Sequence, residues 1–494
     1  MRRTVHALAA GLVLAAGLTA PAFAQKTTAT IGMRLEPPHL DPTAGAAAAI
    51  DEVVYQNVFE GLTRIDADGS VKPGLAESWS ISDDGLTYTF QLRDGVTFHD
   101  GTGFDAEDVK FSFDRARADE STNAQKRIFE PIEAVTVVDP ETVEITLSRP
   151  AGSFLFDLGW GDAVIVAAES ADTNTTAPVG TGPFKFSRWV KGDSVLLERN
   201  EAYWGEPAAL TGATFKFVGD PAASLAAMLA GDLDAYPNFP ATENLPQFEA
   251  DPRFAVVVGT SEGETILALN NREKPFADLK VRQAISHAID RQAIIDGAMF
   301  GYGTPIGSHF APHHPAYEDL TGTYPYALEK ARTLLAEAGY PDGFEATMKL
   351  PPTTYARRSG EIIASELSKI GITVEIIPVE WAQWLEQVFK GHDFDMTIVS
   401  HTEPLDVDIY ARDDYYFGYD NPEFDAIIDT LQSEADPKAR NALFRQAQDM
   451  IAADAVNGFL FQLPKAGVWN AKLKGLWSDA PIQANDLTDV HWAP

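Results

Sequence analysis

The sequence predicts an α/β protein that divides into more than one lobe. In the second half of the chain, amphipathic helical patterns alternate with short apolar runs, an order that implies crossover connections and a largely parallel sheet. In the first half, apolar and polar residues alternate between turn signals, which indicates antiparallel hairpins. The chain has 494 residues, more than one ordinary hydrophobic core accommodates, so two or more lobes are expected.

Three hairpins are predicted in the first half. Each has apolar residues at alternate positions on both sides of a short turn that contains Asp-Gly, Asp-Pro or Lys-Gly-Asp. They span residues 87–98, 135–147 and 184–197. Between the first two, Asp105 is expected to cap a helix whose third position is Asp108, an acidic start that suits the helix dipole.

Helices and strands follow one another closely in the second half. Apolar residues within 281–289 recur at i, i+3, i+4, i+7 and i+8, which predicts one helix face. His287 lies off this stripe and is interpreted as a surface or second-layer residue. Gly339 and Gly371 are expected to end the next two helices. The further elements are helices over 326–338 and 361–370, a strand over 372–376, a helix bearing Trp381, Trp384 and Val388, and a buried strand over 394–399.

Residues 1–24 have the pattern of a cleaved export signal. Arg2 and Arg3 form a basic end, residues 7–20 are a short apolar stretch, and residues 22–24 read as an A-x-A cleavage site. The chain has no cysteine, which excludes disulfides, thiolate metal sites, a cysteine nucleophile and a lipid anchor on an N-terminal cysteine. We therefore expect a freely diffusing periplasmic protein without a membrane anchor.

The charge balance excludes partners rather than identifying one. The chain has 38 Lys and Arg against 72 Asp and Glu, a net charge of −34. Such a surface repels nucleic acid and anionic membranes, and it keeps an exported protein soluble. We expect a monomer that binds no nucleic acid.

Five blocks of sequence occur in a fixed order along most of the chain. They are NVFEGL at 57–62 with PGLAESW at 73–79, LTYTF at 86–90 with FHDG at 98–101, GTGPF at 180–184, VRQAI at 281–285 and NPEFD at 421–425. Together they resemble the peptide/nickel/opine-binding family (family 5) of periplasmic solute-binding proteins. This family serves ABC importers for dipeptides, oligopeptides, nickel chelates, opines and some sugars.

The resemblance implies a type II periplasmic-binding-protein fold, with two hinged lobes and an extra subdomain inserted in the N-terminal lobe. By this resemblance lobe I comprises residues 26–50, 170–262 and 468–494, the inserted subdomain residues 51–169, and lobe II residues 263–467.

The loop after the strand at 394–399 is the main candidate for a binding site, because ligands of open α/β lobes bind beyond the carboxyl ends of strands. The resemblance implies an aspartate in this loop that pairs with the amino group of the ligand, an attraction that strengthens in a dry cleft. The loop is shorter than the family pattern and offers three acids, Glu403, Asp406 and Asp408, of which Glu403 is preferred. The alternative is that these acids cap a helix or face solvent.

Four other residues are candidates for the cleft. Trp381 matches a family tryptophan that lines it, with a place in the core as the alternative, and Trp384 lies one helical turn further on. Arg412 could pair with a ligand carboxylate as a bidentate fork, although neighbouring aspartates compete for it. His39 belongs to a stretch that resembles the border of the cleft in relatives.

His401 is expected in the cleft, where a histidine either hydrogen-bonds a ligand or binds a metal. The adjacent His313 and His314 lie in a proline-flanked loop, and no ligand spacing of the H-E-x-x-H kind is present. We therefore predict no resident metal and no cofactor.

The resulting functional hypothesis is a non-enzymatic, substrate-binding subunit of an ABC importer. It captures a peptide or a related amine-bearing small molecule by lobe closure and delivers it to the permease subunits. A nickel-type metal chelate or an oligosaccharide is the alternative ligand, and service to a chemoreceptor stays open. An exported hydrolase is the alternative from another class. The chain has no G-x-S-x-G element, but a glycosidase-type pair of carboxylates is not excluded by counting residues.

Overall fold

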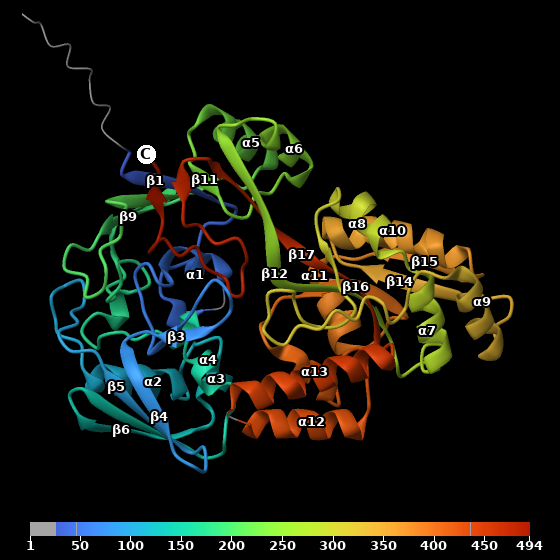
Figure 1. Cartoon of the computed structure of the whole chain (residues 1–494), viewed down its shortest axis with the longest axis horizontal. Helices are drawn as coiled ribbons and strands as arrows, with labels where there is room; N and C mark the ends of the chain where they lie inside the picture. The colour runs from blue at the N-terminus through green and yellow to red at the C-terminus, as the bar shows by residue number, and fades with distance from the viewer. Residues whose placement is uncertain (1–25, 46, 435) are drawn as a thin grey trace, which may run out of the picture.

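The computed structural model describes residues 26–45, 47–434 and 436–494. Two lobes lie side by side, and the long strands β12 (Phe254–Leu269) and β17 (Asn457–Asn470) run from one lobe into the other (Figure 1). The predicted export signal at 1–24 lies outside the described residues. Within the described ranges, no helix is both long enough and apolar enough to cross a membrane.

The first lobe is built on one half of an eleven-stranded sheet, in the order β17-β11-β1-β10-β9-β8. Its core joins segments that are distant in the chain, such as Ile31, Phe215 and Val490, all buried. Its other elements are β1 (Thr28–Met33), α1 (Ala48–Val54), β8 (Phe184–Val190), β9 (Ser194–Arg199), β10 (Gly212–Phe217), α5 (Pro221–Ala230), β11 (Ala235–Tyr236), α6 (Leu245–Glu249), β18 (Leu473–Lys474) and β19 (His491–Trp492).

A smaller unit below the first lobe has its own four-stranded sheet, in the order β4-β5-β7-β6, and its own core (Figure 1). The predicted cap by Asp105 at its main helix is confirmed, and Asp108 completes a capping box with it. Its elements are β2 (Thr63–Ile65), β3 (Val71–Pro73), β4 (Ala76–Ile81), β5 (Thr87–Leu92), α2 (Ala106–Arg117), α3 (Lys126–Phe129), β6 (Ile132–Asp139), β7 (Thr142–Leu147) and α4 (Phe154–Asp157).

Two of the three predicted hairpins are confirmed, as β6 with β7 and β8 with β9. The hairpin over 87–98 is wrong, because β5 pairs with β4 and β7 instead. Gly95 and Gly101 both have positive φ and bend the chain tightly, so Val96 and Phe98 enter the core from a loop.

The second lobe carries the other half of the sheet, in the order β15-β14-β16-β12. The parallel pairing of β14 with β15 and β16 agrees with the sequence, but the whole sheet is mixed because β12 and β17 pair antiparallel. His287 is buried, with Nδ1 2.8 Å from the carbonyl oxygen of Pro325. The elements are α7 (Leu279–Ala288), α8 (Arg291–Met299), β13 (Thr304–Pro305), α9 (Leu328–Glu337), β14 (Glu345–Leu350), α10 (Thr354–Ser368), β15 (Thr373–Pro378), α11 (Trp381–Trp384), β16 (Met396–His401), α12 (Pro422–Ser433) and α13 (Pro437–Ala453).

The register of β12 against β17 breaks where the two lobes meet. Residues 254–260 pair with 464–470 in the first lobe, and residues 264–268 pair with 457–462 in the second, with a shift between Thr260 and Glu264. The lobes also touch away from these strands, where the amide of Gly152 donates to the carbonyl oxygen of Gln432 at the end of α12, at 2.9 Å (Figure 1). The space between the strand crossing and this contact is therefore bounded on two sides.

Candidate functional site

A cavity of about 400 Å³ lies between the two lobes. Its walls come from α1, from the segment 160–162 after α4, from the break in β12 at 261–263, from the loop 402–404 after β16, and from residues 480–484 near the C-terminus. Tyr55, Trp160 and Ile482 give it apolar surface. A volume of this size and a mixed lining are typical of small-molecule sites.

Carboxylates dominate the polar lining of the cavity, with Asp51, Glu52, Asp162, Glu262 and Glu403 contributed from both lobes and from the strand crossing. Glu262 is paired, because its Oε1 lies 2.5 Å from Nε2 of His313. Glu52 accepts a long hydrogen bond from Asn238, at 3.4 Å. Burial raises the pKa of Glu52 to about 7, although this amide and Lys465 oppose the rise.

Asp51 and Asp162 are the least satisfied of these acids. The Oδ1 atoms of both are buried and have no hydrogen-bond partner within the described part of the chain. Burial first, then the charges of Asp162 and Glu52, raise the pKa of Asp51 well above its ordinary value. Burial raises the pKa of Asp162 to about 7, although the charge of Arg127 opposes this.

A glycine makes the position of Asp51 possible. A Cβ added at Gly161 would lie 2.1 Å from Oδ1 of Asp51, so any larger residue would displace this carboxylate. The missing side chain at Gly161, next to Asp162 in the sequence, therefore gives the Asp51 carboxylate its space.

Of the acids predicted in the loop after β16, Glu403 lines the cavity and is exposed. Asp406 is buried and faces inward, with Oδ1 2.9 Å from Nε2 of His309. The other ring nitrogen of His309 lies 2.8 Å from Oε1 of Glu264, an ion-pair distance without hydrogen-bond alignment. Burial alone would lower the pKa of His309, but Glu264 and Asp406 outweigh it and raise the pKa to about 10. His309 is thus a buried cation between two acids.

Asp408, Arg412 and His401 are held by other protein groups and are not among the residues that line the cavity. The guanidinium of Arg412 donates to both oxygens of Asp408, at 2.9 and 3.1 Å. Nε2 of His401 lies 3.1 Å from the hydroxyl of Tyr416, and burial lowers the pKa of His401.

The two predicted tryptophans, Trp381 and Trp384, lie in different environments. Trp384 is 4% exposed and its Nε1 donates to Thr397 Oγ1 at 2.9 Å, whereas Trp381 is 41% exposed and contacts Trp384 edge to face. His39 lies outside the cavity lining, and its Nε2 would be 2.7 Å from a Cβ at Gly45, a residue that lines the cavity.

Sequence reasoning missed Asp51, Asp162 and Trp160. Asp51 and Asp162 are separated by more than a hundred residues and belong to no periodic pattern. The sequence signal that could have indicated this site is the W-G-D tripeptide at 160–162, in which a glycine in a turn separates an indole N–H group from a carboxylate.

Three side chains that could hold a metal come close together beside the cavity. His401, Glu403 and Asp406 each offer one ligand atom, and these atoms lie within 4.8 Å of one another. Two of the three already have partners, Asp406 in His309 and His401 in Tyr416.

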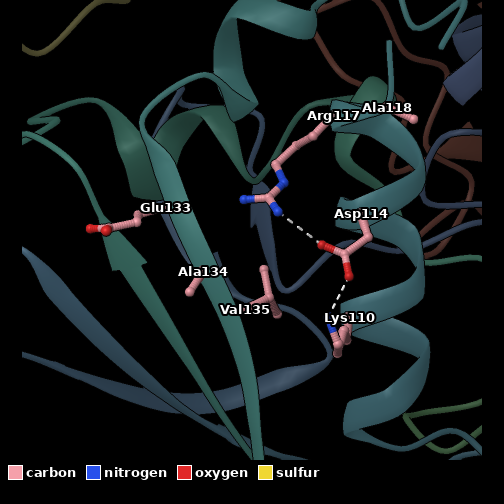
Figure 2. A pocket seen from close by; sticks show the side chains of 7 residues that line it. All are labelled: Lys110, Asp114, Arg117, Ala118, Glu133, Ala134 and Val135. Atoms are coloured by element: carbon pink, nitrogen blue, oxygen red, sulfur yellow. Dashed lines mark hydrogen bonds and ion pairs between the residues drawn. The ribbon is translucent and has the colours of Figure 1, made fainter. Parts of the chain in front are cut away.

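A second depression, of about 470 Å³, lies on the outer surface between α2 and β6 (Figure 2). Its charged groups satisfy one another, since Asp114 pairs with both Lys110 and Arg117, and Figure 2 shows Glu133 pointing away from them. Because its lysine, arginine and aspartate are already paired and Glu133 points away from them, it is not the candidate site.

Two lobes joined by continuous strands, with a polar cavity between them, define a solute-binding protein. Residues 70–421 match the model described as "Bacterial extracellular solute-binding proteins, family 5 Middle", and the chain belongs to this family.

Known proteins are similar to the chain over most of its length. Heme-binding protein A of Haemophilus influenzae is 32% identical over 441 residues, which cover 80% of each chain. Glutathione-binding protein GsiB of Salmonella paratyphi A is 31% identical over 476 residues, 90% of this chain and 91% of that one. The ABC transporter-associated periplasmic binding protein DppA from Helicobacter pylori, solved with the peptide STSA, superposes with a TM-score of 0.75 at 27% identity, covering 95% of this chain and 99% of that one. All three are named as binding proteins rather than as enzymes.

Proposed function

We propose that this chain is the periplasmic substrate-binding subunit of an ABC importer, which captures a peptide or a related amine-bearing small molecule between its lobes and delivers it to the permease. The observation that carries the proposal is the cavity between the lobes, whose polar lining is mainly carboxylate. In a water-poor space, an unpaired carboxylate favours an ammonium group strongly over a neutral or anionic one. The peptide bound by the DppA relative supports this class of cargo.

Glu403 is the proposed partner of the ligand amine in the second lobe. Within the loop 403–408 its carboxylate lines the cavity, whereas those of Asp406 and Asp408 face His309 and Arg412. On closure Glu403 would face the acids on the other side of the cavity, so a bound ligand would be contacted from both lobes. Ligand contacts in both lobes favour the closed form, which the permease would recognise.

The proposed division of the chain is the one that the family resemblance implies, with lobe I at 26–50, 170–262 and 468–494, an inserted unit at 51–169 and lobe II at 263–467. Separate hydrophobic cores support it. Residues 53–65, at the start of the inserted unit, also pack into the core of the first lobe. Residues 1–24 are proposed as a cleaved export signal, which gives the periplasmic location, and the cargo is proposed to leave the protein chemically unchanged.

Isothermal titration calorimetry with dipeptides and their N-acetylated forms tests the proposal. The amine-bearing forms should bind and the acetylated forms should bind at least tenfold more weakly, since acetylation removes the charge that Glu403 meets. Glu403→Gln should weaken the amine-bearing forms by about tenfold, the value of one charge-assisted hydrogen bond. Asp413→Asn, at an exposed acid of a nearby segment, is the matched control and should bind normally.

Mass spectrometry of the recovered dipeptides completes the test. Cleaved peptides would identify a hydrolase and overturn the proposal. Equal affinity for free and acetylated peptides would remove the amine as the recognised group.

A metal chelate is the second candidate ligand, favoured by the close approach of His401, Glu403 and Asp406. Nickel with L-histidine, titrated in the same calorimeter, separates the two candidates. Under the peptide proposal Ni–histidine should bind no more tightly than the dipeptides, and His401→Gln should leave dipeptide affinity within about twofold.

A further inference from the structure

The wall of the cavity formed by α1 and the segment 160–162 holds buried polar atoms that have no hydrogen-bond partner in the described part of the chain. Asp162 is only 8% exposed, yet its Oδ1 has no hydrogen-bond partner among the described residues, and the same holds for Oδ1 of Asp51. Nε1 of Trp160, whose side chain lines the same wall, is also buried without a partner. Buried polar groups in native proteins are almost always hydrogen-bonded, so three such atoms around one cavity indicate groups intended for a ligand.

A purely structural role does not account for the two aspartates. They are like charges taken out of water, and Glu52 adds a third negative charge to Asp51. The cation that acts on Asp162 is Arg127, which is itself exposed to solvent. Such an arrangement destabilises the empty protein, and binding sites commonly accept that loss because a ligand reverses it.

We propose that Asp51 and Asp162 form a subsite for a cationic group of the ligand, so that the cargo carries two separated cations, one at this subsite and one at Glu403. This inference rests on the proposed function and names its ligand class, basic dipeptides and compounds of the same charge pattern. The cation bears N–H groups, an ammonium or a guanidinium, because the free Oδ1 atoms accept hydrogen bonds that a quaternary ammonium cannot donate. The indole N–H of Trp160 is available to an oxygen on the same ligand.

The inference separates this chain from its relatives named for heme and for glutathione. Heme and glutathione each carry two carboxylates, and glutathione has a single ammonium group. An anionic cargo would add like charge to a wall that already holds Asp51, Glu52 and Asp162. We therefore expect heme and glutathione to bind at least tenfold more weakly than a basic dipeptide.

Calorimetry with paired dipeptides tests the subsite. Ala-Arg is compared with Ala-citrulline, and Arg-Ala with citrulline-Ala, because citrulline replaces the guanidinium by a neutral group of nearly the same shape. The better arginine peptide should bind at least tenfold more tightly than its citrulline partner, and this ratio should fall to within about twofold in Asp51→Asn/Asp162→Asn. Asp41→Asn is the matched control. Asp41 is a fully buried acid of the same lobe with protein partners of its own, Thr43 and Arg115, and its variant should keep the ratio.

A second measurement needs no ligand. Asp51→Asn should raise the Tm of the empty protein at pH 8 by about 1–3 °C, because it removes a buried charge next to Asp162. Asp41→Asn should lower the Tm, because it weakens an ion pair. The raised pKa values of Asp51 and Asp162 mean that their destabilising charge is absent near pH 4 and develops as the pH rises, which for Asp162 occurs at about pH 7. The gain in Asp51→Asn should therefore vanish at pH 4.

The possible failures are distinguishable. Equal affinity for Ala-Arg and Ala-citrulline, with both bound through a free amine, overturns the subsite and leaves the proposed function standing. Tight binding of glutathione, a peptide with a single ammonium group, overturns the subsite alone, whereas tight binding of heme without any dipeptide overturns both. A Tm that falls at pH 8 in Asp51→Asn assigns this residue a structural role and likewise overturns the subsite.

Discussion

His309 is a single residue on which the interior of the second lobe depends. Its ring lies between Glu264 on β12 and Asp406 in the loop after β16, at 2.8 and 2.9 Å, and all three side chains are buried. Removing the cation would leave two buried acids unpaired, a change that typically destabilises proteins by about 3–5 kcal/mol. We predict a loss of this size for His309→Gln in urea unfolding at pH 7.

The difference in stability between wild type and His309→Gln should depend on pH in a defined direction. Because the pKa of His309 is raised to about 10, its stabilising charge is fully present below about pH 6.5 and is lost as the pH rises through about 10. The gap between wild type and variant should therefore narrow from pH 7 to pH 10. His491→Gln, at an exposed histidine on β19, serves as the control and should unfold like wild type. A constant gap would contradict the assignment of the charge to His309.

Residue identity in the candidate site was only partly predictable from the sequence. The rule that ligands bind beyond strand ends directed attention to the loop that contains Glu403, which does line the cavity. The pattern could not tell which acids of this loop face protein cations, because His309 is distant in sequence from Asp406. It gave no indication of Asp51, and for Asp162 only the W-G-D tripeptide at 160–162, since the approach of the two acids depends on the packing of two separate segments. The same packing makes Asp406→Ala unsuitable as a test of binding, because it would unfold the surroundings of His309.

Individual elements were predicted best where a local signal defines them. The capping box of α2 is an example, since Asp105 accepts from the amide of Glu107 at 2.8 Å and Asp108 Oδ2 accepts from the amide of Asp105 at 3.0 Å. We predict that Asp105→Ala lowers the free energy of unfolding by about 1 kcal/mol, the usual contribution of an N-cap. Thermal and urea unfolding measure it, with Asp83→Ala at an exposed turn of the same unit as control. Equal stability of the two variants would show that the cap contributes nothing.

Elements whose partners are distant were predicted less well. β5 has the alternation of apolar and polar residues expected of a strand. Its neighbours are β4 and β7, whereas the sequence after Leu92 suggested a hairpin partner that does not form. The parallel order of β14, β15 and β16 was predictable because helices separate these strands. The antiparallel pairing of β12 with β17, which run through both lobes, was not predictable from the sequence, because each of these strands contributes to the cores of both lobes.

At the scale of the whole molecule, we expect closure to depend on a small contact between residues outside the cavity lining, Gly152 and Gln432. Gly152 lies against the second lobe, and a Cβ there would be 2.0 Å from a guanidinium nitrogen of Arg440 and 2.1 Å from the carbonyl oxygen of Glu434. We predict that Gly152→Ala weakens ligand binding about five- to thirtyfold without touching the cavity, because it raises the free energy of the closed form by about 1–2 kcal/mol.

Small-angle X-ray scattering would measure the same effect directly. The radius of gyration of Gly152→Ala should exceed that of wild type, and ligand should reduce the difference. Gly103→Ala is a matched control in the same unit, since a Cβ there meets no atom within 4 Å, and it should behave like wild type. Unchanged scattering together with unchanged affinity would mean that this contact does not limit closure.

The interleaving of segments in the first lobe also sets an order of assembly. Its core contains Ile31 near the start of the described chain and Trp469, Leu487 and Val490 near the end, and Trp492 Nε1 donates to the carbonyl oxygen of Thr28. The main core of the second lobe, by contrast, is complete at Phe461. A chain that emerges into the periplasm from its N-terminus can therefore finish the second lobe first. The first strand, β1, has to wait for the segment 469–492 and stays a substrate for chaperones until this segment arrives.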